Sequence, residues 1–166
     1  MTARLLLAAL ALSLSACALR PLYGGGSSSP AAVTLRSMEV APIEGRVGWL
    51  VRNKLVERLA ATGDDAPVYR LEVELDDTII GLGIRGDRAA TRERRTLRAR
   101  YRLIELASGS VVLDAAAGSD AGIDVVSSEY ATIAAEQTAA ERLSEVVADQ
   151  IVARLGLFAV RSAQPQ

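Results

Sequence analysis

The 166-residue sequence contains no histidine and a single cysteine, and these two shortages exclude much of the catalytic chemistry found in enzymes. Without histidine, neither Ser-His nor Cys-His nucleophiles can form, and the usual zinc ligand sets are missing. Cys17 has no second cysteine with which to form a disulfide, so the core has to hold the fold. The glutamates near the C-terminus are spread around a predicted helix rather than paired for acid-base chemistry. The composition therefore argues against an enzyme, and the sequence shows no cofactor or metal site.

A hydrophobic run long enough to cross a bilayer is also missing, because the one candidate stretch is too short. That stretch, from Leu5 to Leu14, follows Arg4 and precedes small residues. A secretory signal has this layout, with about 7–15 apolar residues, whereas a membrane-spanning helix needs about 20. The segment Leu14-Ser15-Ala16-Cys17 is similar to a bacterial lipobox, which implies cleavage before Cys17 and acylation of its side chain. The alternative is an ordinary signal peptide with an incidental cysteine beside the cut.

A lipid on Cys17 would hold a soluble domain at a membrane surface without a spanning helix. In lipoproteins generally, an aspartate after the cysteine favours the inner membrane, whereas Ala18 in this chain favours the outer membrane. The run from Gly24 to Ser29 is typical of a flexible tether, and Pro30 is expected to stop any helix. We predict a signal peptide over residues 1–16, an acylated N-terminus and tether over 17–32, a folded domain over 33–158 and a tail over 159–166.

The rest of the chain shows two hydrophobic periods, and half of its residues are apolar, which is enough for a packed core. Short apolar or alternating runs predict strands over residues 33–40, 69–75, 97–103 and 111–117. Helical spacing predicts a helix over 47–59 and a longer one that begins at Ser127 or Ser128 and ends at Gly156. The order β-α-β-β-β-α predicts an α+β fold, a small two-layer sandwich with a mostly antiparallel sheet packed against two helices.

The segment from Gly81 to Gly86 matches the pattern G-x-G-x-x-G, which lets backbone amides face a pyrophosphate in dinucleotide-binding proteins. That function needs an apolar helix directly after the glycines. Here an arginine-rich stretch leads into a predicted strand instead. A chance match in a glycine-containing loop is therefore the better interpretation.

Arginine is concentrated in one segment, where eight arginines between residues 85 and 102 accompany only two acids, Asp87 and Glu93. Three interpretations are open: a solvated strand face, a contact with nucleic acid, or a contact with anionic lipid head groups. Export from the cytoplasm and the lack of interleaved aromatic residues argue against nucleic acid. Arginine binds phosphate through two parallel hydrogen bonds, and alternation places Arg98, Arg100 and Arg102 together on the polar face of their strand.

Two further stretches resemble the LptE family of lipopolysaccharide-assembly lipoproteins, especially its alphaproteobacterial form. The first is Arg20-Pro21-Leu22-Tyr23-Gly24, which follows closely after the predicted acylated cysteine. The second and more specific is the last predicted helix, and the matching residues there are Ser128-Glu129-Tyr130-Ala131, Ala135-Glu136-Gln137, Ala139, Arg142-Leu143 and the run from Ala148 to Leu155. The order of elements also agrees with the family's small α/β sandwich.

The resemblance implies an outer-membrane lipoprotein that plugs the lumen of the β-barrel LptD, supports its assembly and binds lipopolysaccharide. The interior of such barrels is polar, so a plug should present polar side chains. We expect the patch that faces lipid A phosphates to comprise Arg85, Arg88, Arg92, Arg94 and Arg95. The protein would be lipid-anchored on the periplasmic side of the outer membrane, with no nucleic-acid partner. The alternative function is an auxiliary outer-membrane lipoprotein of a lipid-transport ABC system.

Overall fold

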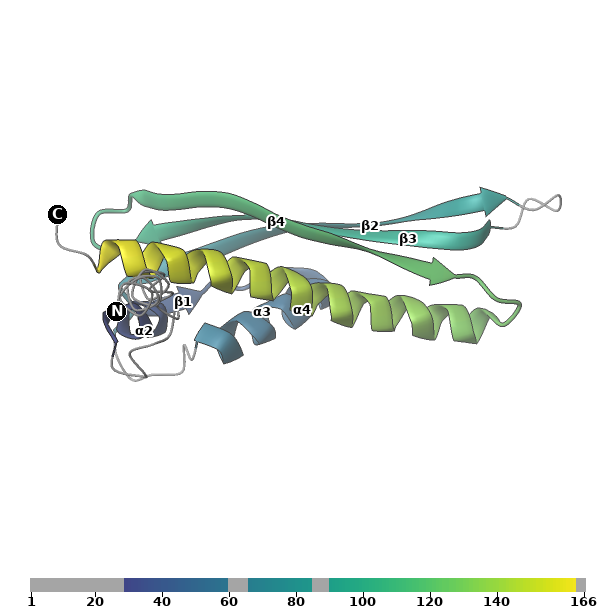
Figure 1. The fold of residues 1–166 in the computed structure, drawn as a ribbon, viewed down its shortest axis with the longest axis horizontal. Helices are drawn as coiled ribbons and strands as arrows, with labels where there is room; N and C mark the ends of the chain where they lie inside the picture. Colours follow the sequence, from purple (N-terminus) through teal and green to yellow (C-terminus); the bar gives the residue numbers. More distant parts are fainter. Residues whose placement is uncertain (1–28, 60–65, 85–89, 164–166) are drawn as a thin grey trace, which may run out of the picture.

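The computed structural model describes residues 29–59, 66–84 and 90–163, and within them the chain folds into a layer of strands and a layer of helices (Figure 1). The elements follow in the order α2 (Pro30–Arg36), β1 (Met38–Val40), α3 (Gly45–Leu59), β2 (Tyr69–Ile84), β3 (Ala90–Glu105), β4 (Val111–Asp124) and α4 (Glu129–Ser162). The predicted α+β class with a mostly antiparallel sheet is confirmed. No helix in the described segments is long and apolar enough to span a membrane.

The sheet has the order β1-β2-β3-β4, and its three long strands follow one another as antiparallel neighbours. β1 is short and pairs in parallel with the start of β2, where Val40 lies opposite Leu71. The predicted strands over 69–75, 97–103 and 111–117 are therefore correct in place but only about half as long as the observed ones. Each long strand continues beyond the region of clear alternation, and the three continue together because they pair with one another.

The predicted strand over 33–40 is wrong for most of its length, because Pro30 begins a helix instead of preventing one. The side chain of Ser29 accepts a hydrogen bond from the backbone N–H of Ala32 at 3.2 Å and so caps the helix. Proline suits the first turn of a helix, where its missing N–H has no partner to lose. Helix α2 then buries Leu35 and ends at Ser37, and only Met38–Val40 forms a strand.

The long last helix begins as predicted and ends later than predicted. Ser128 is its N-cap, and its side chain accepts a hydrogen bond from the N–H of Ala131. The helix continues through Gly156, which is buried, to Ser162. A glycine inside a helix costs about 1 kcal/mol relative to alanine. Packing offsets that cost, because the ring of Phe158 meets the ring of Tyr69 edge-on with centroids 5.8 Å apart, and Ala159 is fully buried.

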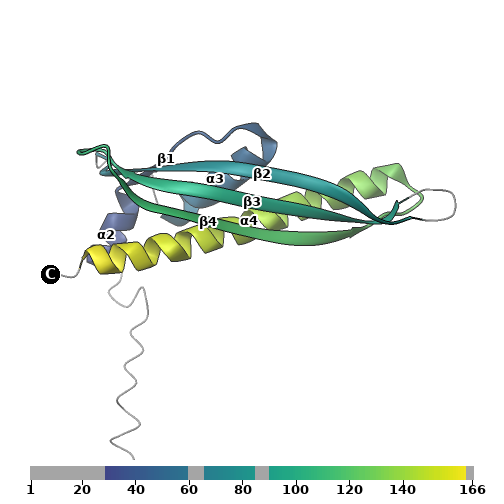
Figure 2. The same cartoon turned by 90° about the horizontal axis from the view of Figure 1, so that it is seen from above.

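We call the paired segments 69–75, 99–105 and 111–117 the root half of the sheet, and the segments 76–84, 90–98 and 118–124 the distal half. The hydrophobic core lies under the root half, where α2, α3 and the C-terminal part of α4 meet the strands (Figure 2). Toward the other end of the molecule only α4 accompanies the strands. The largest fully buried side chains in the core include Met38, Leu55, Leu59, Leu71, Tyr101, Leu103, Ile151 and Leu155.

Candidate functional site: the open face of the sheet

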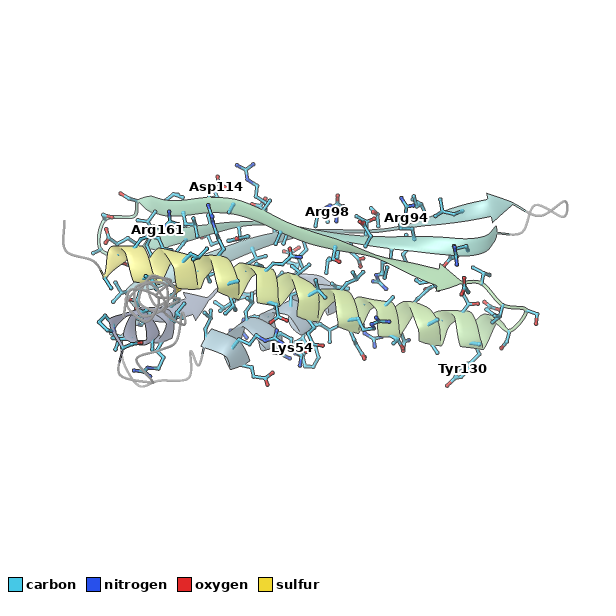
Figure 3. The ribbon with its side chains drawn as sticks, viewed as in Figure 1. Lys54, Arg94, Arg98, Asp114, Tyr130 and Arg161 are labelled. Carbon is cyan, nitrogen blue, oxygen red and sulfur yellow. The ribbon has the colours of Figure 1, made fainter. Side chains whose placement is uncertain are left out.

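One face of the sheet carries no helix, and we call it the open face. Side chains alternate along a strand, so the buried Leu97, Ala99 and Leu103 of β3 face the helices while the even-numbered residues between them face outward. In Figure 3 the labelled Arg94, Arg98 and Asp114 lie on the side of the sheet away from the helices. The arginines that share this face of β3 are Arg92, Arg94, Arg98, Arg100 and Arg102.

Most of this arginine column is compensated by acids on the two neighbouring strands. In the register, Arg102 lies between Glu72 of β2 and Asp114 of β4, and Arg92 lies opposite Asp124. Arg98 and Arg100 instead reach acids that are diagonal to them on β4. Opposite charges on facing or diagonal positions of neighbouring strands attract each other. The resulting pairs are Arg92 with Asp124 at 3.1 Å, Arg98 with Asp120 at 3.3 Å, Arg100 with Asp114 at 3.0 Å and Arg102 with Glu72 at 3.2 Å.

The electrostatics of the acids agree with this pairing. The hydrogen bond from Arg100 lowers the pKa of Asp114 and raises the pKa of Arg100 itself. A hydrogen bond from the hydroxyl of Thr96, at 2.7 Å, is the main cause of the lowered pKa of Asp120, and the nearby guanidiniums of Arg98 and Arg94 lower it further. These carboxylates therefore stay charged near neutral pH, and most of the arginine charge on this face is neutralised locally.

Arg94 is the exception on the open face. Its register partners are Ile80 on β2 and Gly122 on β4, neither of which carries a charge. The acids diagonal to it are already bound, Asp120 by Thr96 and Arg98 and Asp124 by Arg92. Within the described residues the guanidinium of Arg94 consequently has no ion pair. It lies in the distal half beside Ile80, whose side chain is 50% exposed.

Arg95 lies on the opposite face of the sheet from Arg94, so the structure divides the predicted patch. Its guanidinium donates two hydrogen bonds to Asp77, at 2.8 and 2.5 Å, and a third to the backbone carbonyl of Glu136 on α4 at 2.8 Å. Its side chain is only 12% exposed, and the hydrogen bond with Asp77 raises its pKa. Arg95 therefore joins the sheet to α4 and is not available to a ligand on the open face.

Of the other predicted site residues, Arg92 shares the open face with Arg94, whereas Arg85, Arg88 and Cys17 lie outside the described residues. The segment Gly81–Ile84 forms the end of β2, and the next described element is β3. The helix that nucleotide binding would require does not follow in the described part of the chain. There, too, no three histidine, cysteine, aspartate or glutamate side chains lie close enough together to hold a metal ion.

A cleft of about 440 Å³ lies on the helix side, between β2, the beginning of α3 and the N-terminal half of α4. The pair of Asp77 and Arg95 lies in its wall, next to the apolar side chains of Leu75 and Ile133. The residues that line it are Glu44, Gly45, Arg46, Val47, Gly48, Leu75, Asp77, Arg95, Ile133, Glu136, Gln137 and Ala140. Sequence reasoning missed this cleft, because its residues come from four elements and no local pattern joins them.

The sequence also did not predict the contact that closes the edge of β4. The side-chain amide of Gln150, on α4, accepts from the N–H of Gly118 at 3.0 Å and donates to the carbonyl of Gly118 at 3.3 Å. A Cβ at Gly118 would lie 2.5 Å from the Cδ of Arg98, so a larger residue here would displace the side chain of Arg98. The glycine thus lets the arginine side chain lie flat across the open face.

The comparisons with known proteins concern the family and the fold. A model of the family LptE, described as lipopolysaccharide-assembly, matches residues 32–155. Among solved structures, a lipoprotein from Caulobacter crescentus CB15 has a TM-score of 0.67 and 24% identity, over 78% of this chain and 96% of that chain. No curated protein sequence matches.

Two further structures have the same fold at lower identity. The rare lipoprotein B from Shewanella oneidensis has a TM-score of 0.59 and 12% identity, over 76% of this chain and 98% of that one. A minor lipoprotein from Acinetobacter baumannii has a TM-score of 0.58 and 15% identity, over 78% of this chain and 98% of that one. At such identities the structures establish the fold alone.

Proposed function

The chain belongs to the LptE family of lipopolysaccharide-assembly proteins, and on that premise we propose that it is the plug and assembly partner of an LptD-type β-barrel. A role in lipopolysaccharide assembly follows from family membership, and the LptE family consists of outer-membrane-associated lipoproteins rather than enzymes. The plug function is supported by the open face. Its charges compensate one another, so a polar barrel lumen can accept it without leaving a large net charge unpaired.

We further propose that the chain binds lipopolysaccharide through a patch centred on Arg94. The observation that carries this proposal is that the guanidinium of Arg94, beside the exposed Ile80, has no ion pair within the described residues. A planar guanidinium can bind a phosphate through two hydrogen bonds, and the neighbouring aliphatic side chain suits the acyl part of the same lipid. Arg92 adjoins it on the same face, and Arg85 and Arg88 remain part of the proposed patch. Arg95 is left out, because Asp77 holds it on the other face.

The test of lipid binding compares two substitutions that remove the same charge from the same face. Arg94→Gln removes the unpaired arginine, whereas Arg100→Gln removes one that is bound to Asp114. We expect Arg94→Gln to weaken binding of purified lipopolysaccharide about tenfold, the equivalent of one charge-assisted hydrogen bond. Arg100→Gln should change the dissociation constant by less than about threefold. Equal losses in the two variants would show that binding depends on overall charge and not on Arg94.

The test of the plug function is co-purification of the barrel. The full chain is co-expressed with an LptD-family barrel and extracted in detergent, and the two should elute together as one complex. Separate elution would contradict the proposed partnership.

A related prediction concerns the anchor. Cys17→Ala should release the chain from the membrane or block its processing, because acylation needs the thiol. We expect the released domain still to bind the barrel. Loss of barrel binding in Cys17→Ala would mean that the lipid contributes to the complex beyond localisation.

A further inference from the structure

Among the described residues, nothing pairs with the outer edge of β2 from Val73 to Gly81. The carbonyl of Leu71 accepts a hydrogen bond from the N–H of Ala41 at 3.0 Å, so the backbone groups of Leu71 face this edge. Backbone groups alternate in direction along a strand, so the odd-numbered residues that follow also face it. These residues are Val73, Leu75, Asp77, Ile79 and Gly81, and within the described part of the molecule their outward backbone groups have no hydrogen-bond partner.

The edges of the sheet are occupied at two other places. On β4 the side chain of Gln150 occupies the backbone groups of Gly118 and acts as a substitute for a neighbouring strand. On the opposite side, β1 covers the first residues of β2 and is itself only three residues long. Folded proteins usually cover or shorten the edges of their sheets, because an open edge invites another strand to pair with it. The uncovered part of β2 therefore needs an explanation.

A binding groove runs beside this open edge. The side chains of Leu75 and Asp77 point from β2 into the 440 Å³ cleft, and Ile133, Gln137 and Ala140 of α4 form its other wall. The nearby Ile79 and Ile133 are 41% and 44% exposed, which leaves aliphatic surface uncovered. A strand that paired with β2 would lie over the cleft and direct every second side chain into it. Peptide-binding domains that recognise extended segments combine these same two features.

The open-face side of the same edge carries exposed acid. The side chain of Glu74 is 77% exposed, and its ion pair with Arg102, at 3.8 Å, is longer than the one between Arg102 and Glu72. Asp76 has no ion pair within the described residues. A strand beside β2 would therefore be attracted by a basic residue on its open-face side and by an aliphatic residue on its groove side.

From these observations we propose that the β2 edge between Val73 and Gly81 accepts an extended segment of a partner protein as an additional strand. The segment carries a basic side chain beside Glu74 and Asp76 and an aliphatic side chain that enters the cleft. A second copy of this chain fits less well. Among the described residues of its own β2 edge the only base is Arg70, so two copies would bring mainly acids together. The proposal concerns a protein contact and does not depend on lipopolysaccharide binding.

Residue-resolved amide exchange of the full chain tests the proposal directly. The probe is a synthetic peptide of about ten alternating lysine and valine residues, long enough to form a strand. We expect about 1 mM peptide to slow exchange of the outward amides of Leu75, Asp77 and Ile79 about tenfold, as a dissociation constant near 100 μM would require. The even-numbered amides of β2 already bond to β3 and should change little. No slowing at the outward amides would overturn the proposal.

Two controls separate strand addition from simple charge attraction. The same peptide with N-methyl groups on every second residue keeps its charge but cannot pair, and it should give no protection. Gln137→Trp fills the cleft from an exposed position and should abolish protection, whereas Ala134→Trp, on the same helix but outside the cleft, should preserve it. Protection that rises with the concentration of the chain alone, without peptide, would identify a second copy as the occupant and overturn the assignment to a partner.

Discussion

The root and distal halves of the sheet are built from the same three strands, yet they differ in what supports them. In the root half, Leu71, Leu103 and Tyr101 are almost fully buried under three helices. In the distal half, Arg95 and Glu93 take two of the inward positions of β3 next to the buried Leu97, and α4 is the main helix beneath. The inward face is therefore apolar at one end and mixes apolar with charged groups at the other.

The two halves of the sheet therefore contribute differently to stability and to binding. Burial of apolar surface supplies most of the folding free energy, and it is concentrated in the root half. The distal half retains its strands through pairing, but it exposes Ile79 and Ile80. One buried carboxylate oxygen of Glu93 also has no partner in the described part of the chain. The two binding proposals, at Arg94 and at the outer edge of β2, fall on or next to this less supported end. The part of the distal half that does not pack against the core is surface to which other molecules can bind.

The largest expected contrast comes from truncating one side chain in each half. Leu103→Ala removes a fully buried side chain from the root half and should lower the free energy of unfolding by about 2–5 kcal/mol. Ile80→Ala, at a half-exposed distal position, should change it by no more than about 0.5 kcal/mol. Denaturant unfolding of both variants measures the difference. Similar losses would mean that the distal half also carries core stability.

The second prediction concerns Arg95, which connects the distal half of the sheet to α4. Arg95→Met should lower the free energy of unfolding by about 1–3 kcal/mol, because it removes two hydrogen bonds to Asp77, whose side chain is 24% exposed, and a third to the carbonyl of Glu136. Adding Asp77→Leu should recover part of that loss. A double-mutant cycle with a coupling energy near zero would contradict the structural role given to this pair.

A smaller effect is expected from the edge of β4, at the boundary between the two halves. Gln150→Ala removes two hydrogen bonds to Gly118 and should lower the free energy of unfolding by about 1 kcal/mol. Gln150→Glu keeps the size and the acceptor but loses the donor, so it should not restore stability. A thermal melt of the three proteins distinguishes these outcomes, and a Gln150→Glu variant as stable as the wild type would argue against the paired contact.

The smallest effect concerns pH and the exposed ion pairs of the open face. The pKa of Asp114 is lowered by its hydrogen bond from Arg100, so the pair contributes stability when the carboxylate is charged. That contribution is present above the ordinary aspartate pKa of 3.8 and disappears as the pH falls through the lowered value in the folded state. Arg100→Gln should therefore flatten the acid side of the stability curve. Parallel curves for variant and wild type between about pH 6 and pH 2 would contradict it.

The sequence predicted the root half well because its signals are local. Alternation in the strands, helical spacing in α3 and the serine cap of α4 all follow from which residues must be buried or capped next to one another. Pro30 and Gly156 led to wrong helix boundaries because they, too, were interpreted from local signals alone. Each residue usually interrupts a helix, and here the cap at Ser29 and the packing of Phe158 and Ala159 decide the outcome instead.

The distal half could not be predicted in the same way, because its strands are specified by their neighbours. Gly118 to Asp124 shows no alternation of its own and becomes a strand only because it pairs with β3. The candidate site depends equally on register. Arg94 and Arg95 are adjacent in the sequence, but the pleat of β3 places their side chains on opposite faces of the sheet. Which arginine has an ion pair then depends on the residues opposite it on β2 and β4.

The amide of Gln150 also has a consequence for how the molecule folds. β4 is rich in alanine and glycine, so its side chains distinguish poorly between one alignment with β3 and the next. A slip by one residue would turn the N–H and carbonyl of the residue beside Gln150 away from α4 and leave the amide with nothing to bind. Docking of α4 therefore favours the correct alignment of β4 with β3. Without the contact of Gln150, we expect slower folding, because misaligned hairpins have to separate before α4 can pack on them.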